Sequence, residues 1–292
     1  MIGEFLALFA SFCWAFSAVL YRKVLENKGY FIVNLLRVGF ASLFLAFFLP
    51  FLLLTSQLSS LTFNEILLFI FAAVNGPVIG DTLYFIGLKR VGVSRTQSIS
   101  SSYPLFSMVL ATIFLHENLS FAIIVGTPLI VIGIILVLPI ENKNRLNSLD
   151  SFSKFTPVLT AFFWSIALIT FKFILNNSGI NPIFATFINR LFSLPFLFFT
   201  AIAVNEFNQI KKLSKIEVVL ISVAGIVSLG IGGISVFLSL SLLDASKAIP
   251  LSSVSPFFTL ILALIYIKEK LNFKIFVGTI LIVTGIFLLT FC

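Results

Sequence analysis

The sequence predicts an all-α membrane protein of ten transmembrane helices, arranged as two inverted five-helix repeats. Three observations predict this fold class. The composition is 59% hydrophobic and only 10% charged, whereas charged residues make up about 25% of an average soluble domain. Ten apolar segments approach or exceed the roughly 20 residues that a bilayer span requires. Landmark residues also recur at a fixed distance along the chain.

The composition excludes several classes of protein. A soluble chain of 292 residues would expose more polar surface than this composition supplies, which excludes a soluble enzyme and a free nucleic-acid binder. The formal net charge of +8 comes from Lys and Arg at the ends of apolar segments, where charges lie at a membrane surface. The one histidine, His116, excludes a multi-histidine metal site, and Cys13 and Cys292 indicate no disulfide framework.

These exclusions define the expected partners. We expect no enzymatic activity, no cofactor, no metal and no nucleic acid. The expected partners are the lipid bilayer and a small-molecule solute, and the protein is expected to act as a monomer or a homodimer. The expected location is the plasma membrane of a prokaryote, as a multi-pass protein.

The apolar segments are separated by short connections. Gly and Pro interrupt the third segment at Asn75-Gly76-Pro77 and the eighth at residues 230–233, which predicts a local bend or unwinding there. The longest polar stretch, residues 141–154, divides the chain into a first repeat (1–139), a linker (140–154) and a second repeat (155–292). The ten segments cover residues 3–22, 30–54, 64–90, 94–115, 120–139, 155–175, 182–204, 216–243, 246–267 and 273–291.

The two halves repeat one another. Four pairs of landmarks are each 152 residues apart, and two further pairs, Trp14 with Trp164 and Arg37 with Arg190, have nearly the same separation. A five-helix unit has an odd number of spans, so two fused copies must have opposite orientations in the bilayer, which is a transporter architecture. The four pairs are Pro104 with Pro256, Glu117 with Glu269, Gly126 with Gly278, and Gly133 with Gly285.

The chain resembles the ten-helix members of the drug/metabolite transporter (DMT) superfamily that contain two EamA domains. In the first half the resemblance rests on residues 88–95 (LKRVGVSR), 100–106 (SSSYPLF), 116–119 (HENL) and the helix with Gly126 and Gly133. The second half repeats this order with residues 242–247 (LLDASK), 252–258 (SSVSPFF), 268–271 (KEKL) and the helix with Gly278 and Gly285. The resemblance implies secondary transport of small metabolites, often export, with both termini in the cytoplasm.

The distribution of basic residues predicts the opposite orientation. Lys and Arg concentrate in the connections after the odd-numbered segments, and the connections after the even-numbered segments carry only Lys247. The positive-inside rule then places the odd-numbered connections in the cytoplasm and both termini outside.

Four charged residues lie within predicted spans and are candidates for function because charge is costly there. Asp81 is a candidate proton carrier, a substrate contact, or the partner of an arginine in a structural pair. Arg37 and Arg190 are candidates for binding a carboxylate or phosphate, or they extend to the interface. Lys172 lies within a turn of its helix end, where we expect it to reach the membrane surface.

Uncharged polar and aromatic residues complete the candidate cavity. Trp14 and Trp164 lie on faces of small residues, which either line a cavity or let helices pack closely. Hydroxyl groups are dense at the start of the fourth and ninth segments, and they either line a cavity or bond their own helical turn. The further candidates are Ser17, Tyr84, Gln97, Ser100, Ser101, Ser252 and Ser253.

The remaining landmarks have structural interpretations. The seven-residue spacing of Gly126 and Gly133, and of Gly278 and Gly285, predicts that these two helices pack against each other. Glu117 and Glu269 are expected to be structural, as interface and turn residues, each just before an N-cap at Ser120 or Asn272.

The sequence therefore predicts a secondary active transporter, exporting amino acids or related small metabolites by alternating access, with proton coupling through Asp81. One alternative is a transporter of phosphorylated solutes such as nucleotide-sugars. That alternative requires Arg37 or Arg190 to meet Lys89 or Lys247 in one cavity. Two further alternatives are a membrane enzyme acting on lipids and a membrane scaffold without a polar cavity.

Overall fold

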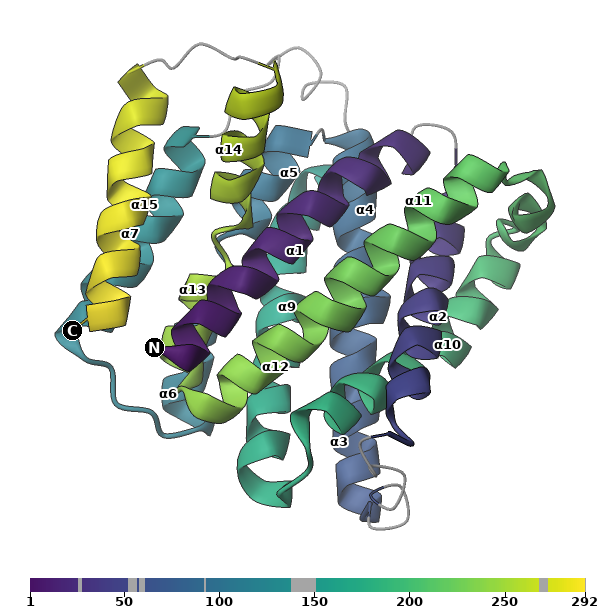
Figure 1. The fold of residues 1–292 in the computed structure, drawn as a ribbon, viewed down its shortest axis with the longest axis horizontal. Helices are drawn as coiled ribbons and strands as arrows, with labels where there is room; N and C mark the ends of the chain where they lie inside the picture. The colour runs from purple at the N-terminus through teal and green to yellow at the C-terminus, as the bar shows by residue number, and fades with distance from the viewer. Residues whose placement is uncertain are drawn as a thin grey trace.

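The computed structural model describes residues 1–25, 28–51, 57, 61–91, 93–137, 151–267 and 273–291, and no strand is assigned among them. Its helices pack side by side in one bundle (Figure 1). In chain order the elements are α1 (Ile2–Leu25), α2 (Tyr30–Phe48), α3 (Phe63–Ala73), η2 (Val74–Gly80), α4 (Asp81–Arg90), α5 (Val93–Ser100), α6 (Tyr103–Phe114), α7 (Phe121–Val137), α9 (Ser151–Ser178), α10 (Pro182–Ala203), η3 (Phe207–Lys212), α11 (Lys215–Gly225), η4 (Ile226–Ile231), α12 (Gly232–Leu242), α13 (Ala245–Ser252), α14 (Ser255–Ile267) and α15 (Phe273–Phe291).

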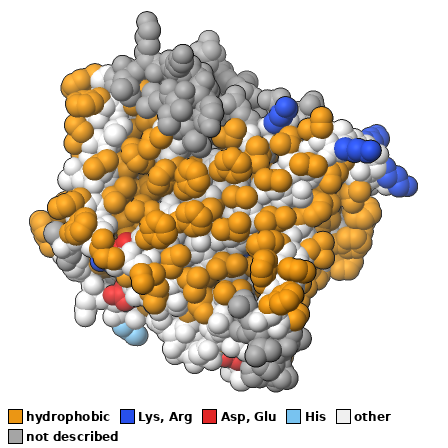
Figure 2. Space-filling model, viewed as in Figure 1, with side chains coloured by type: hydrophobic (Ala, Val, Ile, Leu, Met, Phe, Trp, Pro, Cys, Tyr) orange, Lys and Arg blue, Asp and Glu red, His pale blue; other side chains and the backbone are white. Residues whose placement is uncertain are grey.

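Each of the ten predicted segments coincides with one helix or with a run of shorter helices. Within the described residues, seven helices or continuous helical runs are long and apolar enough to cross a membrane, and α6 and α7 are shorter apolar helices. Hydrophobic side chains cover most of the face in Figure 2, with Lys and Arg at one edge. Many large apolar side chains are exposed, among them Phe121 and Phe273 at 79% each. The protein is therefore an integral, multi-pass membrane protein.

The predicted interruptions of the third and eighth segments take the form of widened turns. The chain remains helical through η2 and η4, both of which are π-helical. Pro77 lies inside η2 and has no backbone N–H to donate, so the normal bonding pattern cannot continue through it. Segments of this kind are frequent at functional sites in helical proteins.

The fourth and ninth segments are each divided into two helices. α5 ends at Ser100 and α6 begins at Tyr103, while α13 ends at Ser252 and α14 begins at Ser255. Pro104 and Pro256 occupy the second position of the new helix, where a missing N–H costs nothing because that donor has no intrahelical partner.

The boundaries of the elements repeat along the chain as the landmark residues do. α3 and α11 begin 152 residues apart and end 152 residues apart, and so do α5 and α13. The two π-helical segments also begin 152 residues apart, at Val74 and Ile226. The last four residues of the predicted linker, 151–154, form the first turn of α9.

The predicted packing of the two glycine-spaced helices is confirmed. α7 and α15 lie side by side in Figure 1 and run antiparallel, since Gly126 faces Gly285 and Gly133 faces Gly278. A Cβ added at Gly133 would lie 2.6 Å from the carbonyl oxygen of Gly278. The two backbones therefore approach more closely than any other residue would allow.

The other contacts that position the site join the two halves. α1, from the first half, packs against α11, η4 and α12 of the second half. α9, from the second half, packs against α3, η2 and α4 of the first. Trp14 on α1 and Trp164 on α9 are therefore each placed beside the π-helical segment of the opposite half.

Glu117 is structural, as the sequence predicted, and its specific role is to cap a helix of the second half. Its two carboxylate oxygens accept hydrogen bonds from the backbone N–H groups of Ala245, at 2.7 Å, and Ser246, at 2.8 Å. These are N–H groups of the first turn of α13, which have no partner within that helix. Ser120 also accepts a bond from the N–H of Ile123, as an N-cap does. Glu269 and Asn272 lie outside the described residues.

Replacing Glu117 with Gln is expected to lower the free energy of unfolding by about 1–2 kcal/mol, the range for a lost cap with its helix-dipole contribution. Glutamine has an NH₂ group in place of one carboxylate oxygen, so one of the two backbone N–H groups would lose its acceptor. Amide hydrogen exchange at Ala245 and Ser246 measures the effect locally. Unchanged exchange at both amides would contradict the capping role.

Candidate functional site

The two halves of the bundle line a common cavity of about 180 Å³, which is room for several water molecules or a small solute. Its lining comes from α1, α2, α3, η2, α4, α5 and α6 in the first half, and from α9, α10, η4, α12 and α14 in the second. Nine of the residues predicted to line a cavity do so: Trp14, Arg37, Asp81, Tyr84, Gln97, Ser100, Ser101, Trp164 and Arg190.

The three other predicted lining residues are buried but do not line this cavity. Ser252 donates to the Ile249 carbonyl oxygen and lies 3.3 Å from the Tyr103 hydroxyl. Ser253 donates to the carbonyl oxygen of Pro250, and Ser17 is fully buried. Ser252, at the end of α13, and Ser253, its C-cap, therefore bond the last turn of that helix, which was the alternative interpretation of the hydroxyl-rich segments.

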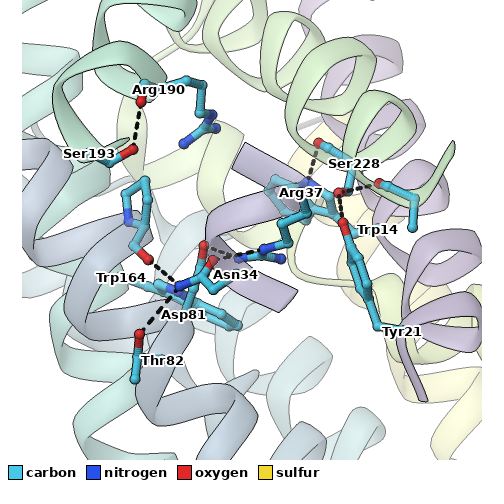
Figure 3. A network of polar contacts seen from close by, with 12 residues as sticks. Trp14, Tyr21, Asn34, Arg37, Asp81, Thr82, Trp164, Arg190, Ser193 and Ser228 are labelled. Carbon is cyan, nitrogen blue, oxygen red and sulfur yellow. Dashed lines mark hydrogen bonds and ion pairs between the residues drawn. The ribbon is translucent and has the colours of Figure 1, made fainter. Parts of the chain in front are cut away.

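A polar network centred on Asp81 lies in the cavity wall (Figure 3). Arg37 forms an ion pair with one carboxylate oxygen of Asp81, and the Trp164 indole N–H donates to the other at 2.8 Å. The Arg37 Nε donates to Asn34 Oδ1 at 2.9 Å, and its guanidinium lies 4.5 Å from the ring centroid of Phe85. Both oxygens of the carboxylate thus have donors, one from each half of the chain.

Asn34 connects this network to the π-helical segment. Its amide nitrogen donates to the carbonyl oxygen of Pro77 at 2.8 Å and is 3.3 Å from the Thr82 hydroxyl. Asn34 is fully buried, so these bonds replace the water that its amide would otherwise contact. The side chain that orients Arg37 therefore also satisfies a carbonyl of η2, directly before Asp81.

Trp14, on α1, lies beside the π-helical segment of the second half, as Trp164, on α9, lies beside that of the first. The hydrogen-bond partners of the two indole groups differ. Its indole N–H donates to the carbonyl oxygen of Ser228 in η4 at 3.1 Å. The Ser228 hydroxyl lies 2.9 Å from the hydroxyl of Tyr21. Tyr84 lies against Trp164, with their ring centroids 5.1 Å apart.

Arg190 lies in the cavity wall without a carboxylate partner among the described residues. It is 7% exposed, and one guanidinium N–H donates to Asn189 Oδ1 at 2.9 Å. The group lies 5.8 Å from the ring centroid of Phe237, and its Nε has no hydrogen-bond partner among the described residues. Figure 3 shows the guanidinium extending from α10 toward the Arg37–Asp81 pair.

None of the three lysines considered in the sequence analysis, Lys89, Lys172 and Lys247, lines the cavity. Lys172 is 6% exposed and donates to the carbonyl oxygens of Leu240 and Leu243, both at 2.8 Å, so the expectation that it reaches the membrane surface was wrong. It instead satisfies carbonyls at the C-terminal end of α12, where cations are favoured.

Sequence reasoning missed several residues of the site. Asn34, Asn189, Ser228 and Phe237 carried no signal that sets them apart from other residues of their helices. Phe85 and Phe237 are 152 residues apart, so the repeat would have indicated Phe237 once Phe85 was known to contact Arg37. Tyr21, seven residues after Trp14 and on the same face of α1, also lines the cavity.

Comparison with known proteins assigns the chain to a family. The EamA-like transporter family matches it twice, over residues 1–138 and 154–291. The chain belongs to this family. It is 28% identical over 290 residues to an uncharacterized transporter of Archaeoglobus fulgidus, covering 99% of this chain and 98% of that protein.

Other relatives of this EamA-like protein match single regions of it. A WAT1-related protein of Arabidopsis thaliana is 29% identical over 143 residues, covering 44% of this chain and 36% of its own length. An uncharacterized transporter of Clostridium kluyveri is 25% identical over 138 residues, covering 47% and 43%. One crystal structure has the same fold, with a TM-score of 0.76 at 14% identity over 99% of this chain and 96% of its own. The family and the two relatives named as transporters support a membrane transporter.

Proposed function

We propose that the protein is a secondary active transporter that moves a small organic metabolite through the cavity by alternating access between its two halves. The observation that carries the proposal is the shared lining: residues of both halves form one polar wall inside an otherwise apolar bundle. A relative movement of the halves would therefore open this cavity to one side or the other. The sequence has no Gly-rich ATP-binding loop, which favours an ion or solute gradient as the driving force. The proposed direction is export, as the resemblance to the DMT superfamily implies.

The proposal includes ten spans in two inverted repeats. Repeats related by an axis in the membrane plane place equivalent helices antiparallel to each other. The antiparallel packing of α7 and α15, which are repeat partners, supports this relation. The repetition of element boundaries at a constant separation supports it as well.

Asp81 is the proposed coupling residue. Its carboxylate connects Arg37 of the first half with Trp164 of the second. Uptake of a proton would remove the charge that Arg37 neutralises and one of the two acceptor oxygens. The contact between the halves would weaken, and this provides a physical link between protonation and the movement of the halves.

Replacing Asp81 with Asn is expected to abolish proton-driven flux while exchange of solute across the membrane continues. Amide and carboxylate have the same shape, but the amide cannot carry a proton on and off. The measurement is uptake and efflux of a labelled panel of amino acids and metabolites in proteoliposomes, with and without an imposed pH gradient. Asp244→Asn is the matched control, because Asp244 is exposed at the start of α13 and outside the cavity.

Two outcomes of this experiment contradict the proposal at different points. Gradient-driven flux that persists in Asp81→Asn would remove proton coupling through this residue and leave transport standing. Absence of any solute flux in the wild-type protein across the whole panel would overturn the transport function itself.

The alternative of phosphorylated solutes lacks the convergence that it requires. The Lys89 ammonium donates to the carbonyl oxygen of Lys28, at 3.3 Å, and Lys247 pairs with Glu4 at 3.1 Å. The charged lining of the cavity comprises Arg37, Arg190 and Asp81. A single net positive charge favours a singly charged solute over a phosphorylated one. The polar cavity also argues against a purely structural scaffold.

A further inference from the structure

We infer that Arg190 is the binding site for a carboxylate group, and that the transported solute is a small organic monocarboxylate. The inference rests on the proposed transport function for the fate of the solute. The binding site itself is argued from a difference between the two halves of the chain.

The two arginines of the site have similar surroundings. Arg37 is held by the amide oxygen of Asn34 and lies over the ring of Phe85, while Arg190 is held by the amide oxygen of Asn189 and lies over the ring of Phe237. Phe85 and Phe237 are 152 residues apart, as the repeat requires. Each half therefore holds a guanidinium group with an asparagine amide oxygen and a phenylalanine ring, although Asn34 precedes Arg37 by three positions and Asn189 precedes Arg190 by one.

The halves differ in the counterion. Asp81 pairs with Arg37, and the residue 152 positions after Asp81 is Gly233. Gly233 faces Arg190 directly, because a Cβ added to it would lie 3.3 Å from the Nη2 of Arg190. The second half thus has a glycine at the position from which the first half supplies a carboxylate, and no ion pair to Arg190 is found among the described residues.

The charge balance favours a monoanion. The described charged groups of the cavity wall are two guanidinium groups and one carboxylate, which leaves one positive charge without a counterion. A buried charge without a partner is strongly unfavourable, so a bound anion would stabilise the site. A zwitterion such as an amino acid brings no net charge and would leave the imbalance in place.

The hydrogen-bonding capacity of Arg190 favours a carboxylate as that anion. A guanidinium group has five N–H donors in a planar fork that matches the two oxygens of a carboxylate. The N–H group on Nη1 of Arg190 is used by Asn189, and the N–H on Nε has no partner among the described residues. Trp14, Phe171 and Phe237 provide apolar lining for the rest of the solute.

The two tryptophans of the chain make the test direct. Trp14 and Trp164 are the only ones in the sequence, and both line the cavity, so intrinsic fluorescence reports on its occupancy. The purified protein in lipid nanodiscs is titrated with sodium pentanoate and with pentanamide at equal ionic strength. The two probes have the same chain length and differ in charge.

Pentanoate is expected to bind the wild-type protein roughly tenfold to a hundredfold more tightly than pentanamide, the range for charge-assisted hydrogen bonds. Arg190→Gln and Gly233→Asp are each expected to remove this preference. The first removes the guanidinium, and the second supplies the counterion that the first half already has. Lys211→Gln, on the exposed surface of η3, is the control for loss of one positive charge.

Equal affinity for pentanoate and pentanamide in the wild-type protein would overturn the inference, and so would an unchanged preference in Arg190→Gln. If Arg190→Gln fails to fold, Gly233→Asp tests the same point without removing the arginine. Tighter binding of norvaline than of pentanoate would overturn the assignment to a monoanion.

The design separates this inference from the transport proposal. Binding of pentanoate that depends on Arg190, with no flux of any solute in proteoliposomes, would leave the carboxylate site standing and overturn transport. Solute flux that is equal in wild type and Arg190→Gln would support transport and overturn the role of Arg190 in binding the solute.

Discussion

Replacing Arg37 with Gln is expected to lower the free energy of unfolding by about 3–5 kcal/mol, the cost of removing one partner of a buried ion pair. The side chains of Arg37 and Asp81 are only 7% and 14% exposed, so water cannot replace the lost partner. The Asp81 carboxylate would then keep only the indole N–H of Trp164 as a donor. The measurement is unfolding by SDS in mixed micelles, followed through tryptophan fluorescence.

A second substitution identifies the cause of that loss. The double variant Arg37→Gln with Asp81→Asn removes both charges, and it is expected to recover most of the lost stability because no charge is left uncompensated. Arg37→Lys, which keeps a positive charge but loses the planar donor fork, is expected to fall between wild type and Arg37→Gln. A double variant as unstable as Arg37→Gln alone would show that the ion pair is not the reason.

Replacing Gly133 with Val is expected to destabilise the protein by about 3 kcal/mol, at the upper end of the usual range for overpacking. The added Cβ would lie 2.6 Å from the carbonyl oxygen of Gly278 and 2.9 Å from the backbone nitrogen of Ile282. Backbone atoms can only yield if α7 and α15 move apart, and this would open the seam along both helices. The same unfolding experiment measures the change.

Gly39→Ala is the matched control for the glycine seam. Gly39 lies within α2, and nothing is found within 4 Å of the Cβ that would be added there. Alanine also has the higher helix propensity, so this variant is expected to be as stable as the wild-type protein or more stable. Equal losses in Gly39→Ala and Gly133→Val would attribute the effect to glycine replacement in general and contradict the seam.

The Asp81 network and the Arg190 site suggest different roles for two arginines that the sequence presents as a pair. Arg37 is neutralised within the protein and contributes to a contact between the halves. Arg190 has supporting residues of the same types but a glycine where the carboxylate would come from. A repeat architecture thus provides two similar pockets, and the difference at one position, Asp81 or Gly233, separates the proposed coupling role of the first from the proposed solute-binding role of the second.

Much of the fold follows from the sequence by itself. The positions of the helices were predictable because burial of apolar side chains in lipid requires a minimum run of them. The interruption at Pro77 was predicted because proline lacks a backbone donor, whereas the division of the fourth segment before Pro104 was not predicted. The packing of Gly133 against Gly278 was predictable because only glycine permits so close an approach, and the repeat relates the two helices.

The pairings inside the site were decided by the tertiary structure alone. The sequence left open whether Asp81 pairs with an arginine and with which one, and it gave Ser252 and Ser253 a place in the cavity that they do not have. It also directed Lys172 to the membrane surface, although that side chain caps α12. The physical reason is common to these cases. Hydrophobicity and backbone constraints depend on residues that are close in the sequence, so they can be predicted from it. A buried polar group instead bonds a partner from a distant helix, and only the packing of the helices decides which partner lies within hydrogen-bond distance.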